Sequence, residues 1–354
     1  MSKFRRIGIL TSGGDAPGMN AAIRAVTRSA IERGVEVMGI YEGYTGLISG
    51  QMKLFGPRDV SNIVNKGGTI LYSARCPEFK TREGLEKAIA SCRENQIDGI
   101  VAIGGDGTFR GATELTELGV PCIGLPGTID NDIASTDYTI GYDTAVNTAV
   151  EMVDRLRDTS ESHARCNVVE VMGRNSGYIA LSTGISVGAS AIAIDEIPFD
   201  EDAAIQKMKS CRANGKRNFL VIVAEGLPGY AEKFTKTIEE KTGIESRFTR
   251  LGHVVRGGNP CARDRIMATR MGEEAVELLL KGESNLVVGT RHGEIVATEI
   301  GFALITDRMY KGTLKEGDLD KYTPAQIAQM KEICAARTAD IQKLYDIADI
   351  TSRN

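Results

Sequence analysis

Residues 99–127 read GIVAIGGDGTFRGATELTELGVPCIGLPG, and this stretch decides how the fold is built. Two short apolar runs, 99–105 and 120–127, flank a segment that begins like a helix at DGTFRG. Near-continuous apolar strands that alternate with helices are typical of parallel sheets covered on both faces. The stretch therefore predicts a strand, a loop, a helix and a second strand of an α/β domain.

The same unit recurs along most of the chain. We expect a helix from about Met19 to Ile31 and a change of domain near Ile140. Further apolar runs, each read as a strand, occupy residues 7–10, 35–41, 166–173, 189–194, 219–226 and 285–290. These runs predict parallel sheets over most of the sequence.

Composition narrows the possible classes of protein. The 354 residues, 42% of them hydrophobic, fit two domains or one large α/β unit. No apolar run approaches the ~20 residues of a membrane-spanning helix, and the N-terminal apolar stretch is too short for a signal peptide. The seven scattered cysteines and the net charge of -4 disfavour a disulfide framework and a general nucleic-acid binder. We expect a cytoplasmic protein without nucleic-acid or membrane partners.

Two glycine-rich loops, residues 12–18 (SGGDAPG) and 104–108 (GGDGT), follow strands and begin helices. Backbone N–H groups at such junctions can hold phosphate oxygens, although each loop alone could be a tight turn. Asp106 would repel a phosphate unless a divalent cation lay between them, and Mg²⁺ is often shared in this way. The chain has no Walker A Lys-[ST] pattern. GGDGT is therefore interpreted as a Mg-nucleotide loop of another architecture.

The segment LPGTIDND, residues 125–132, places Asp130 and Asp132 two positions apart with no basic residue beside them. A solvated turn is one interpretation, because these are common turn residues. Ligands of open parallel sheets, however, gather beyond the carboxyl ends of the strands, where all three loops are expected. The convergence favours a cleft in which one carboxylate removes a proton.

Five motifs occur in order: TSGGDAPGMN, GGDGT, PGTIDND, VVEVMGR and LGHVVRGG. From about Ile7 to about Ile305 the chain resembles the bacterial ATP-dependent 6-phosphofructokinase family. The resemblance implies a glycolytic phosphotransferase that uses Mg²⁺ and moves the γ-phosphoryl group of ATP to the 1-hydroxyl of fructose 6-phosphate. It also implies two similar Rossmann-like three-layer domains with the active site in the cleft between them. The ATP domain would hold residues 1–140 plus about 254–304, and the sugar domain 141–253 plus about 305–354.

The resemblance assigns roles to individual residues. Asp130 becomes the base, a role typically contributing ~10²–10⁴ in rate, and Asp132 supports the loop and the metal region. Thr128 and Arg174 steady the transferring group, and Asp106 bears on Mg²⁺. The implied ATP contacts are Gly14, Arg75, Cys76, Gly105, Asp106, Gly107 and Thr108. The implied sugar contacts are Thr128, Asp130, Arg165, Met172, Gly173, Arg174, Glu225, Arg247, His253 and Arg256.

In the family, Arg165 and Arg247 reach the site from an adjacent subunit, which implies a homotetramer with shared active sites. An effector site for ADP or phosphoenolpyruvate is matched by Arg24, Arg28, Arg157 and Lys216. The chain departs from the effector pattern at Pro57, Ser190, Asn214 and Asn218. We therefore expect weakened activation by ADP.

Alternative functions are distinguished by particular residues. Pyrophosphate-dependent relatives usually carry Asp at the position of Gly107 and Lys at that of Gly127, so the two glycines favour ATP. A lipid or NAD kinase would explain GGDGT only. A catalytically silent subunit should have lost Asp106 or Asp130, and a dehydrogenase should carry an acidic residue for the ribose.

The tail beyond about Tyr310 is longer than short bacterial members need. Its residues 323–350 predict a helix, with Thr323 as the N-cap and Pro324 at the first helical position. An apolar stripe along one face of this helix is expected at Ile327, Met330, Ile333, Ile341, Leu344 and Ile347. We expect it to pack on its own domain or on a neighbouring subunit.

Overall fold

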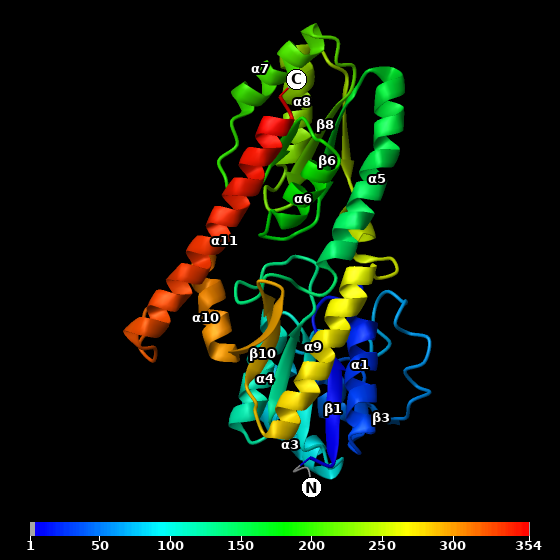
Figure 1. Cartoon of the computed structure of the whole chain (residues 1–354), viewed down its shortest axis with the longest axis vertical. Coiled ribbons are helices and arrows are strands. Elements are labelled where there is room, and N and C mark those ends of the chain that lie inside the picture. Colours follow the sequence, from blue (N-terminus) through cyan, green and yellow to red (C-terminus); the bar gives the residue numbers. More distant parts are fainter. Residues whose placement is uncertain (1–3, 354) are drawn as a thin grey trace. The chain divides into compact units, whose positions relative to one another are not determined.

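The computed structural model describes residues 4–353, which form two compact units (Figure 1). Unit 1 contains the chain through Ile129, Ile133–Asp143 and Gly258–Cys334, whereas unit 2 contains Asp130–Asp132, Thr144–Gly257 and the chain from Ala335. The chain therefore passes from unit 1 to unit 2 for the last time between Cys334 and Ala335, later than the change predicted near residue 305. The reason is that α10 (Ile300–Tyr310) contacts α4 (Asp106–Glu117), and its Phe302 and Ile305 form an apolar cluster with Met330.

Unit 1 is built on a seven-stranded sheet with the order β11-β10-β5-β4-β1-β2-β3. The five central strands are parallel, and the edge strands β3 and β11 are antiparallel. The strands are β1 (Arg6–Thr11), β2 (Glu36–Ile40), β3 (Met52–Phe55), β4 (Gly99–Gly104), β5 (Cys122–Pro126), β10 (Leu286–Arg291) and β11 (Glu294–Glu299). The sequence did not predict β3 and β11, because edge strands are partly exposed and need no apolar run.

Helices cover the sheet of unit 1. Besides α4 and α10 they are α1 (Met19–Glu32), α2 (Tyr44–Ser49), α3 (Arg82–Glu94) and α9 (Ala262–Lys281). Helices α1 and α9 pack closely, since a Cβ added at Gly272 would lie 2.9 Å from the Cβ of Ala25. A separate buried cluster joins Leu10, Ile100 and Phe109 under α3, α4 and α10. These layers fix the carboxyl ends of β1, β4 and β5, where the glycine-rich loops begin.

Unit 2 has a four-stranded, fully parallel sheet with the order β7-β8-β6-β9. Its strands are β6 (Cys166–Val171), β7 (Ala191–Ala193), β8 (Phe219–Ala224) and β9 (Ser246–Arg250). Its helices are α5 (Tyr142–His163), α6 (Tyr178–Ser186), α7 (Glu201–Ala213) and α8 (Tyr230–Thr242). Strand β9, which reads SRFTR, lies at an edge and had no apolar run to reveal it.

The predicted C-terminal helix is α11 (Pro324–Thr351). The Thr323 hydroxyl accepts a hydrogen bond from the Gln326 N–H (3.3 Å), and the Gln326 Oε1 accepts one from the Thr323 N–H (3.0 Å). This reciprocal pair is a capping box. The predicted apolar stripe is wrong at Ile347, which is 42% exposed. Two helical turns correspond to about seven residues, so the residue that follows Ile341 on the buried face is Ala348. Within residues 4–353, no helix is long and apolar enough to cross a membrane.

Candidate active site

The GGDGT loop joins β4 to α4 and is fastened to the first glycine-rich loop. The Thr108 hydroxyl donates a hydrogen bond to the backbone carbonyl of Ser12 (3.1 Å). A Cβ at Gly104 would lie 2.3 Å from the Thr108 Oγ1, whereas a Cβ at Gly105 or Gly107 would meet nothing within 4 Å. The first glycine is thus required by packing, and the other two leave the helix N-terminus open to a phosphate.

Asp106 is the first residue of α4, and its surroundings suit a cation. One of its carboxylate oxygens is buried without a hydrogen-bond partner among the described residues, and the other lies 3.7 Å from the Lys311 Nζ. Burial and the neighbouring charge of Asp106 raise the pKa of Asp307. Among residues 4–353, no group of three or more His, Cys, Asp or Glu side chains could hold a metal. The unpartnered oxygen of Asp106 suits an ion held by one carboxylate and by phosphate oxygens, as Mg²⁺ commonly is.

The other predicted ATP residues lie near the first loop. The Ser73 hydroxyl donates a hydrogen bond to the carbonyl of Gly13, and the Thr11 hydroxyl donates one to the carbonyl of Tyr72 (2.7 Å). These bonds hold the segment that carries Arg75 and Cys76 against the loop that carries Gly14. Gly14 and Arg75 are exposed, and Cys76 is partly buried against the core.

Asp130 lies in unit 2 and is only 5% exposed. Burial raises the pKa of Asp130 to about 6, and the charges of Asp132 and Glu225 act in the same direction, while those of Arg174 and Arg256 oppose it. The Arg174 Nε lies 3.9 Å from the Asp130 Oδ2. A carboxylate whose pKa lies near the working pH is well suited to general base catalysis.

The turn after β6 carries Met172, Gly173 and Arg174. The carboxylate of Glu225 accepts hydrogen bonds from the N–H groups of Gly173 (3.2 Å) and Arg174 (2.7 Å). Arg174 has a φ of 54°, a conformation that is rare for non-glycine residues and is often found at functional sites. Glu225, predicted as a sugar contact, therefore also holds the turn that presents Arg174 to Asp130.

The short 3₁₀ helix η2 (Gly252–Arg256), which follows β9, carries two predicted sugar contacts. Arg256 influences the pKa of Asp130, and His253 is exposed. The structure thus brings Asp130, Arg174, Glu225 and Arg256 together beyond the carboxyl ends of β6, β8 and β9. This edge is where open α/β sheets usually bind their ligands.

Arg165 and Arg247 lie at the opposite, amino end of the same sheet. The Arg165 Nε lies 2.8 Å from the Glu245 Oε2, and an Nη of Arg247 pairs with the other oxygen of this carboxylate. The six residues of β6 span roughly 20 Å, so unit 2 does not bring these arginines to Asp130. Glu245 was not predicted from the sequence, although its position two residues before Arg247 was a usable signal.

The four predicted effector residues are divided between the units. Arg24 and Arg28 lie on α1, where an Nη of Arg28 donates a hydrogen bond to the carbonyl of Pro57 (3.4 Å). In unit 2, an Nη of Arg157 donates to the carbonyl of Val187, and the Lys216 Nζ lies 5.5 Å from the centre of the Phe219 ring. Neither unit by itself assembles the predicted effector set.

Comparison with known sequences is consistent with this geometry. The family model described as phosphofructokinase matches residues 6–279. ATP-dependent 6-phosphofructokinase of Bacillus pumilus is 53% identical over 297 residues, which cover 84% of this chain and 93% of that protein. ATP-dependent 6-phosphofructokinase 1 of Clostridium perfringens is 52% identical over 313 residues, covering 88% and 98% respectively.

Solved structures share the fold. Phosphofructokinase from Saccharomyces cerevisiae matches with a TM-score of 0.83 at 32% identity, covering 99% of this chain and 48% of that one. The Pichia pastoris enzyme matches with a TM-score of 0.82 at 35% identity, covering 97% and 40%. A pyrophosphate-dependent phosphofructokinase from Marinobacter aquaeolei, at 21% identity and a TM-score of 0.75 over 84% and 83%, shares the fold alone. The chain belongs to the phosphofructokinase family.

Proposed function

We propose that this chain is an ATP-dependent 6-phosphofructokinase, which converts fructose 6-phosphate and ATP to fructose 1,6-bisphosphate and ADP. The observation that carries the proposal is Asp130, a buried carboxylate with its pKa raised to about 6 beside Arg174. The names of relatives about half identical in sequence support the same activity.

In the proposed reaction, Asp130 accepts the proton of the sugar 1-hydroxyl as that oxygen attacks the γ-phosphorus of ATP. A new O–P bond forms, the bond from the γ-phosphorus to its bridging oxygen breaks, and ADP leaves with the electron pair. Thr128 and Arg174 steady the phosphoryl group, since such reactions depend mostly on positioning and charge neutralisation. Mg²⁺, when bound with ATP beside Asp106, would neutralise charge on the phosphates.

The sugar phosphate needs cations in addition to Arg256 and Arg174. Arg165 and Arg247 lie at the far end of the sheet of unit 2, which supports their serving the site of a neighbouring subunit. Their planar guanidinium groups suit bidentate binding of a phosphate. We therefore propose a homotetramer with shared sites. Cytoplasmic location and weak control by ADP or phosphoenolpyruvate stay predictions.

An assay of the purified chain with fructose 6-phosphate, Mg²⁺ and either ATP or pyrophosphate tests the proposal. Formation of fructose 1,6-bisphosphate is followed through coupled aldolase and glycerol phosphate dehydrogenase. We expect turnover with ATP and little with pyrophosphate. Turnover with pyrophosphate alone would establish the second candidate, a pyrophosphate-dependent enzyme, and inactivity with both donors would contradict both.

The variant Gly107→Asp tests the choice of donor. Because a Cβ at Gly107 meets no protein atom within 4 Å, the variant should fold normally. The new carboxylate would repel the triphosphate, so we expect kcat/KM for ATP to fall roughly tenfold or more, with the KM for fructose 6-phosphate little changed. Gly107→Ala is the matched control for added bulk. Unchanged ATP kinetics in Gly107→Asp would remove this support.

Gly127→Lys is a poor complementary test. A Cβ at Gly127 would lie 2.9 Å from the Met19 Cε and 3.0 Å from the Ile103 Cγ2. The substitution would therefore disturb the core as well as add a charge. Gly107 is the informative position of the two.

A further inference from the structure

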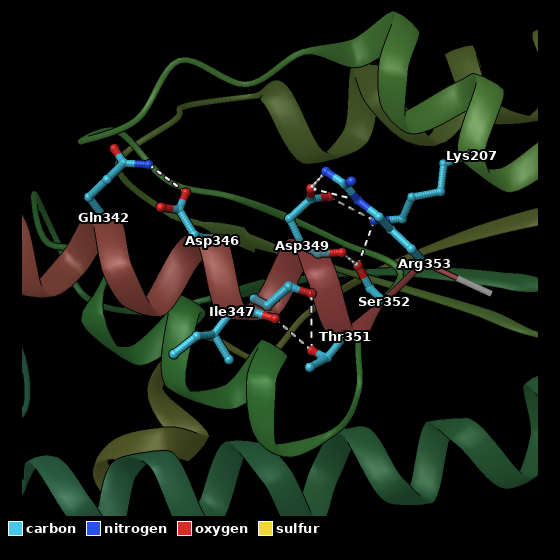
Figure 2. Close-up of polar contacts among 9 residues, drawn as sticks. Lys207, Gln342, Asp346, Ile347, Asp349, Thr351, Ser352 and Arg353 are labelled. Atoms are coloured by element: carbon cyan, nitrogen blue, oxygen red, sulfur yellow. Dashed lines mark hydrogen bonds and ion pairs between the residues drawn. The ribbon is translucent and has the colours of Figure 1, made fainter.

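Arg337 is a buried cation on α11, in the tail beyond the residues matched by the family model. The part of α11 from Ala335 onward belongs to unit 2. Its end is anchored on α7, where the Lys207 Nζ donates hydrogen bonds to the Asp349 Oδ1 (3.2 Å) and the Ser352 Oγ (2.6 Å) (Figure 2). Arg337 is only 8% exposed, although arginine side chains usually reach water.

Arg337 contacts the Asp130–Asp132 loop and the start of α6, and it lies near Glu196, which follows β7. An Nη donates a hydrogen bond to the backbone carbonyl of Asn131. The guanidinium carbon lies 4.7 Å from the centre of the Tyr178 ring. Burial raises the pKa of Glu196 and the nearby positive charge of Arg337 partly counters this, so the two side chains interact electrostatically. A buried charge is costly unless it is paired, and these contacts supply the compensation.

Asn131 is the central residue of the predicted catalytic loop, between Asp130 and Asp132. It is 4% exposed and has a φ of 48°, in the left-handed region. Such a conformation persists when surrounding contacts fix it. The carbonyl that accepts from Arg337 belongs to the peptide that joins Asn131 to Asp132. Holding that peptide fixes the direction in which the chain carries both carboxylates.

Arg174 and Arg337 therefore act on the same loop in different ways. Arg174, with its side chain 68% exposed, faces the Asp130 carboxylate itself. Arg337 is buried and donates a hydrogen bond to the backbone carbonyl of Asn131. Removing Arg174 would change charge at the reacting group, whereas removing Arg337 would release the loop that carries it.

We propose that Arg337 is a positioning residue for phosphoryl transfer: the C-terminal helix uses it to set the Asp130–Asp132 loop. The inference rests on the proposed function. It gives the tail a role in catalysis that the motifs do not reveal. Because misplacing a reacting group by about 1 Å can cost ~10² in rate, a loosened loop should affect turnover more than binding.

The test compares Arg337→Ala, Arg337→Lys and Lys343→Ala in the full-length chain. Lys343 is an exposed residue of the same helix and serves as the matched control. For Arg337→Ala we expect kcat to fall roughly 10- to 100-fold, with both KM values within about threefold of wild type. Arg337→Lys, which keeps the charge but lacks the planar guanidinium group, should recover part of kcat. Lys343→Ala should match wild type.

Thermal unfolding and direct binding of fructose 6-phosphate accompany the kinetics. Wild-type kcat in Arg337→Ala would overturn the inference. So would a parallel loss of kcat, sugar binding and thermal stability in both Arg337 variants, because that pattern indicates a purely structural role. A wild-type chain inactive with ATP would instead overturn the proposed function, and this inference with it.

Discussion

The two ends of the sheet in unit 2 carry different kinds of charged groups. Beyond the carboxyl ends, Asp130 is buried, and its raised pKa reflects desolvation that Arg174 and Arg256 only partly offset. At the amino end, Arg165 and Arg247 share the carboxylate of Glu245, and the three side chains are 28%, 53% and 40% exposed. The contact with Arg165 lowers the pKa of Glu245.

This difference suits the two ends of the sheet to different functions. Desolvation at the carboxyl end yields a group that can take a proton near neutral pH. The arginines at the amino end are unsuited to take up a proton, because a guanidinium group keeps its charge, but they can bind a phosphate dianion. Changes to Asp130 should therefore lower kcat, and changes to Arg165 or Arg247 should raise the KM for the sugar phosphate.

The largest effect is expected for Asp130→Ser. Loss of the base should lower kcat by ~10²–10⁴ or more, because Asp130 is the buried carboxylate that would take the proton beside Arg174. Binding of fructose 6-phosphate, measured by calorimetry, should persist. A variant with more than a tenth of wild-type kcat would show that Asp130 is not the base.

Arg247→Ala should have the next largest effect. Loss of a bidentate phosphate contact should raise the KM for fructose 6-phosphate roughly 10- to 100-fold, with kcat reduced much less. Arg217→Ala, which alters another exposed arginine of unit 2, is the control. If the KM of Arg247→Ala equals that of wild type, the amino end has no part in sugar binding.

The smallest effect is expected for Asp132→Asn. The charge of Asp132 raises the pKa of Asp130, so its removal should lower that pKa. The base would then stay ionised at more acidic pH, and the acid limb of the kcat profile should move to lower pH. An acid limb that moves to higher pH would mean that Asp132 does not act on Asp130 through its charge.

The sequence predicted the strands that lie under helices, because burial on both faces requires a continuous apolar run. It did not predict β3, β9 and β11, which lie at sheet edges where polar residues are tolerated. The motif residues could be named from the resemblance. The strand predicted over residues 166–173 already separates Arg165 from Arg174, whereas the place of Arg247 could not be predicted, because β9 has no apolar run.

The contacts that hold the site together were also invisible in the sequence. Glu225 was predicted as a sugar contact, yet its hydrogen bonds to the backbone of the Arg174 turn arise only from the pairing of β6 with β8. Arg337 lies in a tail without recognised motifs, 206 residues along the chain from Asn131, which it contacts. Such long-range contacts depend on tertiary packing, which neither helical periodicity nor a motif encodes.

The most direct test is the pH dependence of single-turnover phosphoryl transfer in wild type and in Asp130→Ser, both saturated with fructose 6-phosphate and MgATP. Because the folded pKa of Asp130 is raised to about 6, wild-type turnover should fall as the pH drops through that value, where the base becomes protonated. The residual turnover of Asp130→Ser should lack this limb. An acid limb of the same midpoint in both proteins would assign the titration to another group and contradict the central role given to Asp130.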